Sequence, residues 1–280
     1  MIEKPGILYL CATPIGNLED MTYRAVRILS EVAVIAAEDT RHTRKLLSHF
    51  DIHTRLISYH EHNKIERGPE IIERLLAGED VAVVSDAGLP GISDPGADLV
   101  ALAVAAGITA VPLPGANAAL SALVCSGLDT TLFSFIGFLP KSKKKRRELI
   151  ASFVGSPYTM VFYESPHRIK ITLTELQSAF GDRPAVAARE LTKKFEEFIR
   201  GTLSSLELHF SEHAPRGEFT LIVAGQPDCQ KTEVNPEEQI PLADAVLALM
   251  ETGTTKKDAI KAVAIQRGLP KREVYQAVLG

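Results

Sequence analysis

Short apolar runs alternate with longer segments of helical spacing through the first 114 residues. This alternation predicts βα units with a mainly parallel sheet, and hence an N-terminal α/β domain over residues 1–114. The expected strands are Ile7–Ala12, Val32–Ala37, Arg55–Ser58, Val81–Ser85 and Thr109–Pro112. The expected helices are Thr22–Ser30, Thr40–Phe50, Lys64–Leu76 and Ala97–Ala106.

The pattern changes at Gly115, where the expected strands follow one another closely. Close spacing of this kind indicates a mixed sheet, in a C-terminal α/β domain over residues 115–226. A helix is expected over Ala116–Gly127, and strands at Phe133–Gly137, Thr159–Glu164, Ala185–Glu190, Phe195–Gly201 and Glu218–Ala224.

The end of the chain, residues 227–280, predicts a linker and a small helical module. Pro227–Pro241 is polar and has no hydrophobic period, as is typical of a linker. Leu242–Leu279 predicts three short helices, separated at Gly253 and at Gly268–Pro270.

Composition excludes some classes of protein. The formal net charge is −4, so nucleic-acid binding would have to depend on local basic patches. The apolar stretches are strand-length, far below the roughly 18 residues that span a bilayer, and the N-terminus lacks the features of a secretory signal. A cytoplasmic location is therefore expected. Cys11, Cys125 and Cys229 are odd in number and far apart, which favours neither a disulfide framework nor a zinc cluster.

Three loops rich in Gly and Pro follow predicted strands, at Thr13–Leu18, Ser85–Gly96 and Pro112–Ala119. Ligands of open α/β sheets bind outside the carboxyl ends of strands, so these loops are candidate binding elements. The first loop alone is equally well explained as a tight turn. In the second, we assign Asp94 to helix capping and Asp86 to a ligand.

These loops belong to a longer series of motifs that runs in order from Thr13 to Glu197. The series is TPIGNL, AEDTRHT, SYHEHN, SDAGLPGISDPG, GFLPKSKKKRR, FYESPHR and ARELTKKFEE. Jointly these motifs resemble the tetrapyrrole-methylase superfamily of S-adenosylmethionine-dependent methyltransferases, and in particular its ribosomal RNA branch.

The resemblance implies two α/β domains of the class III methyltransferase type, usually in a homodimer, with S-adenosylmethionine in the cleft between them. It implies 2′-O-methylation of a cytidine ribose in the decoding region of 16S rRNA, cytidine 1402, with the assembled small ribosomal subunit as the expected partner. By position, the donor pocket would include Pro14, Asp86, Ala87, Gly88, Pro90, Ala118, Ala119, Phe162, Tyr163 and Glu218. Ala116-Asn117 departs from the residues common in this branch.

Methyl transfer to a ribose hydroxyl needs alignment of the hydroxyl and a group that accepts its proton, without a metal or covalent intermediate. Glu38, Asp39 and Arg41 follow the second predicted strand. We expect Glu38 and Arg41 on the substrate side of the cleft. Asp39 is explained equally well by catalysis and by capping of the next helix.

Two further motifs supply candidates. His60 is a candidate base, with metal binding by His60 and His62 and capping by Asn63 as the alternatives. Arg189 and Lys193 lie between two strands of the second domain, where they form either a charged surface hairpin or contacts with RNA phosphate and the reacting hydroxyl. Glu164 and Arg168 are expected to form a structural ion pair.

A basic cluster indicates the RNA partner. Six cations fall within seven positions, and so many like charges repel one another unless an anion offsets them: Lys141, Lys143, Lys144, Lys145, Arg146 and Arg147. The C-terminal helices have a spacing that resembles a helix-turn-helix, with Val246, Leu249 and Met250 as apolar anchors. They are expected to bind RNA in an auxiliary role, or else to dock structurally.

The leading hypothesis is therefore an RNA ribose methyltransferase. A methylase of tetrapyrroles or other small molecules would share the donor pocket but would not need the basic cluster. A catalytically silent RNA-binding assembly factor would use the basic residues but not the donor loops.

Overall fold

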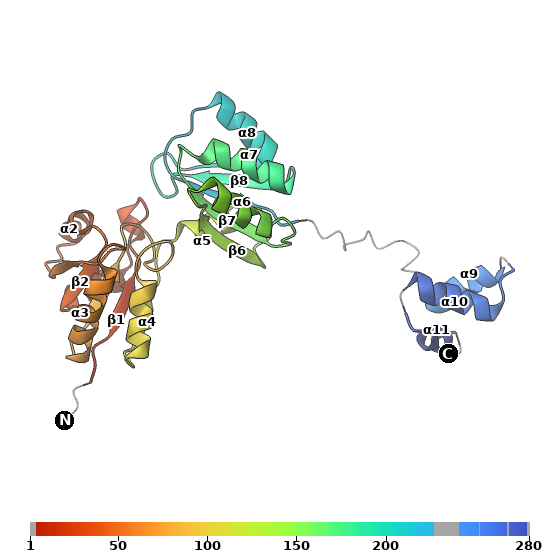
Figure 1. Ribbon diagram of the computed structural model, residues 1–280, viewed down its shortest axis with the longest axis horizontal. Coiled ribbons are helices and arrows are strands. Elements are labelled where there is room, and N and C mark those ends of the chain that lie inside the picture. The colour runs from red at the N-terminus through yellow and green to blue at the C-terminus, as the bar shows by residue number, and fades with distance from the viewer. Residues whose placement is uncertain (1–3, 227–240, 252, 268, 279–280) are drawn as a thin grey trace. The chain divides into compact units, whose positions relative to one another are not determined.

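The computed structural model describes residues 4–226, 241–251, 253–267 and 269–278, in two compact units, Met1–Gln226 and Pro227–Gly280 (Figure 1). Most of the predicted linker, residues 227–240, lies outside the described residues. Our division of the first unit into two domains at residue 114 stays a prediction, although each of its two sheets lies on one side of that point.

The first sheet is parallel throughout, with strand order β3-β2-β4-β1-β5. Its strands are β1 (Leu8–Cys11), β2 (Val34–Ala37), β3 (Leu56–Ser58), β4 (Val81–Val84) and β5 (Ala110–Leu113). The connecting helices are η1 (Leu18–Asp20), α1 (Tyr23–Glu31), α2 (Thr40–His49), α3 (Lys64–Leu76) and α4 (Ala97–Ala105). The predicted parallel sheet is thus confirmed, and α3 has the predicted bounds.

This sheet is covered on both faces, which explains why β2 and β4 are apolar at every position. One core contains Leu29 of α1 and Leu47 of α2, and the other contains Leu75 of α3 and Leu99 of α4. Each of these leucines is at most 3% exposed, and burying such a side chain stabilises the fold by about 1.5–3 kcal/mol. The carboxyl ends of all five strands therefore meet at one fixed edge.

The second sheet is mixed, as predicted, with order β6-β7-β10-β8-β9; only the β6–β7 pair is parallel. Its strands are β6 (Phe133–Phe138), β7 (Thr159–Glu164), β8 (Pro184–Arg189), β9 (Glu197–Thr202) and β10 (Phe219–Val223). Its helices are α5 (Ala118–Val124), α6 (Lys143–Ser152), α7 (Ile169–Phe180) and α8 (Leu203–Glu212). The predicted helix at Ala116 begins later because the Asn117 side chain caps it by accepting from the Leu120 N–H.

The second unit contains α9 (Leu242–Glu251), α10 (Lys256–Gln266) and α11 (Lys271–Ala277), which confirms the three predicted helices. Val246 of α9 is fully buried with Val263 of α10 and Val274 of α11. The predicted anchors thus pack into the core of this unit itself. Among the described residues, no helix is long and apolar enough to cross a membrane.

Candidate active site

The loops after β1 and β4 are joined directly at the carboxyl edge of the first sheet. The Thr13 N–H donates to the Gly88 carbonyl at 2.9 Å, and the Gly88 N–H donates to the Thr13 carbonyl at 3.0 Å. The Thr13 hydroxyl also donates to the Ser85 carbonyl. Two of the predicted donor loops therefore form one preorganised surface.

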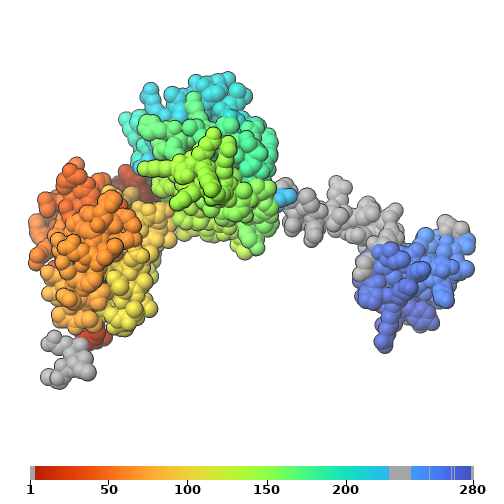
Figure 2. All heavy atoms as spheres, viewed as in Figure 1, coloured from red at the N-terminus to blue at the C-terminus, as the bar shows by residue number. Residues whose placement is uncertain are grey.

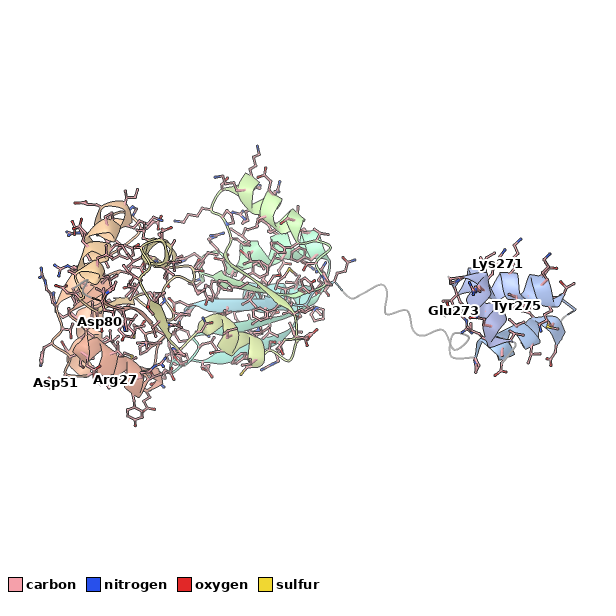
Figure 3. All side chains as sticks on the ribbon, turned by 90° about the horizontal axis from the view of Figure 1, so that it is seen from below. Arg27, Asp51, Asp80, Lys271, Glu273 and Tyr275 are labelled. Atoms are coloured by element: carbon pink, nitrogen blue, oxygen red, sulfur yellow. The ribbon has the colours of Figure 1, made fainter. Side chains whose placement is uncertain are left out.

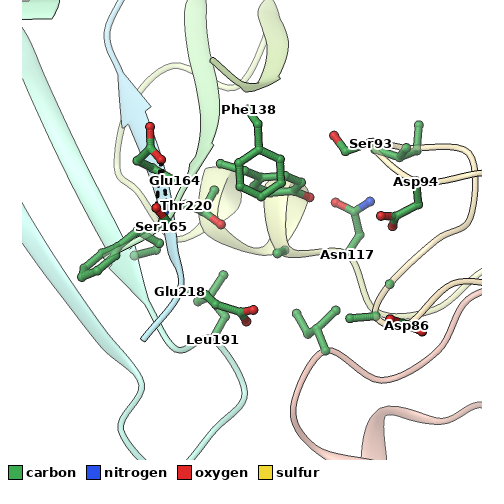
Figure 4. A pocket seen from close by; sticks show the side chains of 18 of the residues that line it. Asp86, Ser93, Asp94, Asn117, Phe138, Glu164, Ser165, Leu191, Glu218 and Thr220 are labelled. Atoms are coloured by element: carbon green, nitrogen blue, oxygen red, sulfur yellow. Dashed lines mark hydrogen bonds between the residues drawn. The ribbon is translucent and has the colours of Figure 1, made fainter. Parts of the chain in front are cut away.

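A pocket of about 480 Å³ is lined by these loops and by residues of the second sheet (Figure 4). Asp86, Asp94 and Asn117 lie on one side of it, and Leu191, Glu218 and Thr220 on the other. Its volume falls within the range of small-molecule sites, roughly 300–1,000 Å³. Eight predicted site residues line this pocket: Glu38, Asp86, Ala87, Gly88, Ala118, Tyr163, Lys193 and Glu218.

Four side chains from neighbouring strands of the second sheet form a row on the pocket wall. Phe138 of β6 pairs with Tyr163 of β7, Tyr163 with Thr220 of β10, and Thr220 with Ala188 of β8. All four line the pocket. The Phe138 and Tyr163 rings lie 5.5 Å apart, and the Tyr163 hydroxyl accepts from the Ala119 N–H at 3.3 Å. Phe138 is 58% exposed and so presents an open aromatic surface to a ligand.

Glu38, Asp86 and Asp94 form a carboxylate cluster in the pocket. Burial, reinforced by the neighbouring Glu38 and Asp86 carboxylates, raises the pKa of Asp94 to about 6. Burial and the Asp86 carboxylate also raise the pKa of Glu38. Our assignment of Asp94 to helix capping was wrong, because the N-cap of α4 is Gly96 and no side chain caps that helix.

Asp39 caps α2, which confirms one of the two interpretations given to it. Its carboxylate accepts from the Arg41 N–H at 2.8 Å and from the Arg41 guanidinium at 3.2 and 3.0 Å. These bonds to Arg41 lower the pKa of Asp39 to about 2, so its carboxylate is a poor proton acceptor. The Asp39 N–H in turn donates to the Asp86 carboxylate at 3.1 Å. Neither Asp39 nor Arg41 is among the residues that line the pocket.

Lys193 connects the second sheet to the first donor loop. Its ammonium donates to Glu190 and to Glu218, each at 2.8 Å. Burial lowers the pKa of Lys193, but these two bonds outweigh that effect and raise it overall. The lysine therefore remains a cation. Its aliphatic stem crosses Gly16, where an added Cβ would lie 2.3 Å from the Lys193 Cγ.

The Arg189 side chain forms its contacts within its own hairpin region, which agrees with the interpretation of this segment as a charged surface hairpin. Its guanidinium donates to the Arg216 carbonyl at 2.7 Å and pairs with Glu197 at 3.2 Å. Arg189 does not line the pocket. Its contact with RNA phosphate stays a prediction.

His60 lies close enough to Glu38 for its charge to affect that carboxyl, although it does not line the pocket. Its buried Nδ1 has no hydrogen-bond partner within the described structure. Asn63 occupies the N-cap position of α3 as expected, but its side chain makes no cap hydrogen bond. The Asn63 side chain instead accepts from the His60 N–H and donates to the Ser58 carbonyl, which fixes the turn.

Several predicted donor contacts do not face the pocket. Phe162 is 1% exposed in the core on the opposite face of the second sheet, because neighbouring residues of a strand point to opposite faces. Its side chain was therefore assigned wrongly. Pro14, Pro90 and Ala119 are also absent from the lining, and the first loop contributes Ile15 instead. The predicted Glu164–Arg168 ion pair is present at 3.7 Å.

The basic cluster divides into exposed and buried cations. Lys141, Lys143, Lys144, Lys145 and Arg147 are exposed at or near the first turn of α6, a green region of the surface in Figure 2. Arg146 is only 9% exposed; its guanidinium pairs with Glu175 at 2.5 and 2.8 Å and donates to the Lys141 carbonyl. The prediction that Arg146 binds RNA was therefore wrong, because its donors stabilise the fold.

Sequence reasoning missed Asp94, Phe138 and Leu191 as pocket residues, whereas Thr220 lies in the strand after Glu218 that was expected in the donor pocket. Asp94 carried a signal in its dense Gly/Pro loop, but a cap explained it equally well. Phe138 is placed by the pairing of β6 with β7, and Leu191 lies in the loop between β8 and β9; the sequence offered no signal for either. In the described part of the chain, no group of three or more His, Cys, Asp or Glu residues has the arrangement of a metal site.

Comparison with known proteins adds a family match and close relatives. The family model described as Tetrapyrrole (Corrin/Porphyrin) Methylases matches residues 7–207. The chain is 51% identical over 274 residues to Ribosomal RNA small subunit methyltransferase I of Halalkalibacterium halodurans, covering 98% of this chain and 94% of the relative. The relative of the same name from Bacillus subtilis is 50% identical over 276 residues, covering 97% and 94%.

Solved structures share the fold at low sequence identity. Cobalt precorrin-4 methyltransferase, a cobalamin biosynthetic enzyme, is similar with a TM-score of 0.56 and 18% identity, covering 79% of this chain and 96% of that one. A diphthine synthase is similar with a TM-score of 0.56 and 14% identity, covering 79% and 90%. These similarities show the fold alone.

Proposed function

Because the chain belongs to the family of Tetrapyrrole (Corrin/Porphyrin) Methylases, we propose that it methylates RNA of the small ribosomal subunit, with S-adenosylmethionine as the donor. The reaction we propose is 2′-O-methylation of a cytidine ribose in the decoding region of 16S rRNA. The names of relatives that are 46–51% identical support the RNA substrate. The ribose position comes from the motif resemblance.

The carboxylate cluster is the observation that carries this proposal. Three acids in one partly buried pocket repel one another, as the raised pKa of Asp94 and of Glu38 reflects. A cationic ligand relieves that repulsion, and S-adenosylmethionine carries a sulfonium and an ammonium. The exposed ring of Phe138, with Tyr163, Thr220 and Ala188 in the same row, forms a surface that suits a flat base. The residues present therefore fit this donor.

When bound, S-adenosylmethionine supplies a methyl group activated by its positively charged sulfur. Glu38 has the properties of the proton acceptor for the ribose hydroxyl, because it lines the pocket and its raised pKa makes it more basic than an ordinary carboxylate. Lys193, held as a cation by Glu190 and Glu218, stabilises negative charge that develops on the hydroxyl oxygen. Asp39, Arg41 and His60 shape the substrate side around Glu38.

The exposed cations of α6 form the proposed RNA contact outside the pocket. Each can pair with a backbone phosphate, which gives affinity without reading sequence. We further propose a cytoplasmic homodimer. Leu120 and Val124 of α5 support the dimer, because they are 49% and 68% exposed one helical turn apart.

Transfer of a radiolabelled methyl group tests the proposal. Purified protein would be incubated with labelled donor and with small ribosomal subunits lacking the modification, naked rRNA or porphyrin precursors. Label recovered in an alkali-resistant 2′-O-methylated dinucleotide is the expected result. Label confined to porphyrin precursors, or RNA binding without any transfer, would overturn it.

The role of Glu38 has its own test, with Glu73 as a matched control because it is exposed on α3. Glu38→Gln is expected to lower kcat about a hundredfold or more, a much larger effect than the loss of donor affinity from removing one of the three cluster charges. Glu73→Gln should leave both unchanged.

A further inference from the structure

A basic groove lies on the second unit, lined by residues of α10 and α11. Its lining includes five cations and one aromatic residue, together with Asp258 and Ile260. These six are Lys256, Lys257, Lys261, Lys271, Arg272 and Tyr275. The motif resemblance does not extend to this segment, which starts well after Glu197.

The charges of this unit are segregated toward the groove. Residues 241–280 contain six Lys and Arg residues, of which five line it. The same residues contain four acids, of which only Asp258 lines it. Asp258 is already engaged, since its carboxylate accepts from the Thr255 hydroxyl at 2.7 Å. The groove therefore carries a strong local positive charge on a chain whose net charge is −4.

The core of the unit fixes this face toward solvent. Val263 and Ala264 of α10 and Val274 of α11 are buried against α9. Lys257 and Lys261 are one helical turn apart, as are Lys271 and Tyr275 (Figure 3), so each pair shares a helix face. All five cations are exposed, and within the described residues none of them forms an ion pair.

We propose that this groove binds backbone phosphates of RNA, and that Tyr275, 49% exposed, stacks on an unpaired base. This proposal rests on the proposed function, which supplies the RNA, but it concerns a second contact outside the pocket. RNA fits better than a lipid surface. A peripheral membrane helix needs apolar side chains beside its cations, whereas the groove's aliphatic residue, Ile260, is only 6% exposed.

The test uses the full-length protein and an RNA fragment that contains the decoding region. Lys261→Ala/Lys271→Ala removes one cation from each groove helix. The matched control, Arg27→Ala/Arg74→Ala, removes one cation from the middle of α1 and one from the last turn of α3, neither of which lines the pocket or the groove. Equilibrium binding would be measured over a series of salt concentrations.

We expect the groove variant to bind RNA about tenfold more weakly. The slope of log affinity against log salt concentration should be smaller in magnitude by about 1.4, because two phosphate contacts are lost. Lys261→Arg/Lys271→Arg should restore both, which separates loss of charge from misfolding. In the transfer assay KM for RNA should rise while kcat and donor affinity stay constant. Tyr275→Ala should weaken binding several-fold without changing the salt dependence.

Two results would overturn the groove proposal. One is unchanged RNA affinity and salt dependence in the Ala double variant. The other is loss of binding to phosphatidylglycerol vesicles with RNA binding intact. Because binding is measured without methyl transfer, failure of the proposed reaction would leave this test interpretable.

Discussion

Replacing Asp94 by Asn should stabilise the protein at neutral pH and not in acid. The pKa of this carboxyl is about 6 in the folded chain against an ordinary value of 3.8, because of burial and the Glu38 and Asp86 charges. Between these two values the folded chain binds more protons than the unfolded chain. Stability therefore falls as pH rises through that window, and the loss is complete above the folded pKa.

The size of the effect follows from the shift. About two pKa units correspond to about 3 kcal/mol, and discounting for partial solvent screening leaves about 2 kcal/mol. Asn keeps the shape of the side chain and removes the charge. We expect Asp94→Asn to raise Tm by about 4–8 °C near pH 8, and by only about 1 °C near pH 4.

Thermal unfolding followed by circular dichroism at these two pH values measures this difference. Glu73→Gln is the matched control, because its exposed carboxylate on α3 is solvated in both states. An Asp94→Asn shift of the same size at both pH values would refute the electrostatic argument and leave only a packing effect.

Three other predictions follow from the contacts described above. Lys193→Met should lower kcat about a hundredfold with little change in donor affinity, because the cation that lines the pocket is lost. An equal loss of donor affinity in a binding titration would contradict the proposed role of Lys193 toward the substrate. Arg146→Ala should reduce the free energy of unfolding by about 3 kcal/mol, because Glu175 is left unpaired. In contrast, Lys144→Ala/Lys145→Ala should weaken RNA binding without lowering stability. Denaturant melts and RNA titrations distinguish these two roles. Donor binding near pH 6 should release protons, because a cationic ligand lowers the pKa of Asp94. Calorimetry in buffers of different ionisation enthalpy would detect this release. Asp94→Asn should abolish most of it.

Local patterns predicted the elements well. The periodicity of α3 gave its bounds directly, and the apolar runs located every strand of the first sheet to within two residues. The position of the expected donor loops was also predictable, because a Gly- and Pro-rich segment directly after a buried strand must lie at the sheet edge. Such inferences need only neighbours in sequence.

The errors arose where a partner distant in sequence decides the outcome. Arg146 belongs to a run of cations, yet Glu175, 29 residues away, makes it a structural residue. Phe162 and Tyr163 were both assigned to the donor, although a strand presents only one of two neighbours to each face. Asp94 looked like a cap because the approach of Glu38 to Asp86 and Asp94 is set by the packing of two separate strand-end loops, one after β2 and one after β4.

Because the Lys193 stem packs against Gly16, a substitution at a position without any reactive group would disturb the proposed catalytic cation. Gly16 has φ of 155°, and any side chain there would displace the lysine stem from its path between Glu190 and Glu218. A single-base change at this codon would thus displace Lys193, the cation that we propose for catalysis, without altering an acid, a base or a residue that lines the pocket. The proposed activity therefore depends on the missing Cβ at position 16 as well as on the groups that react.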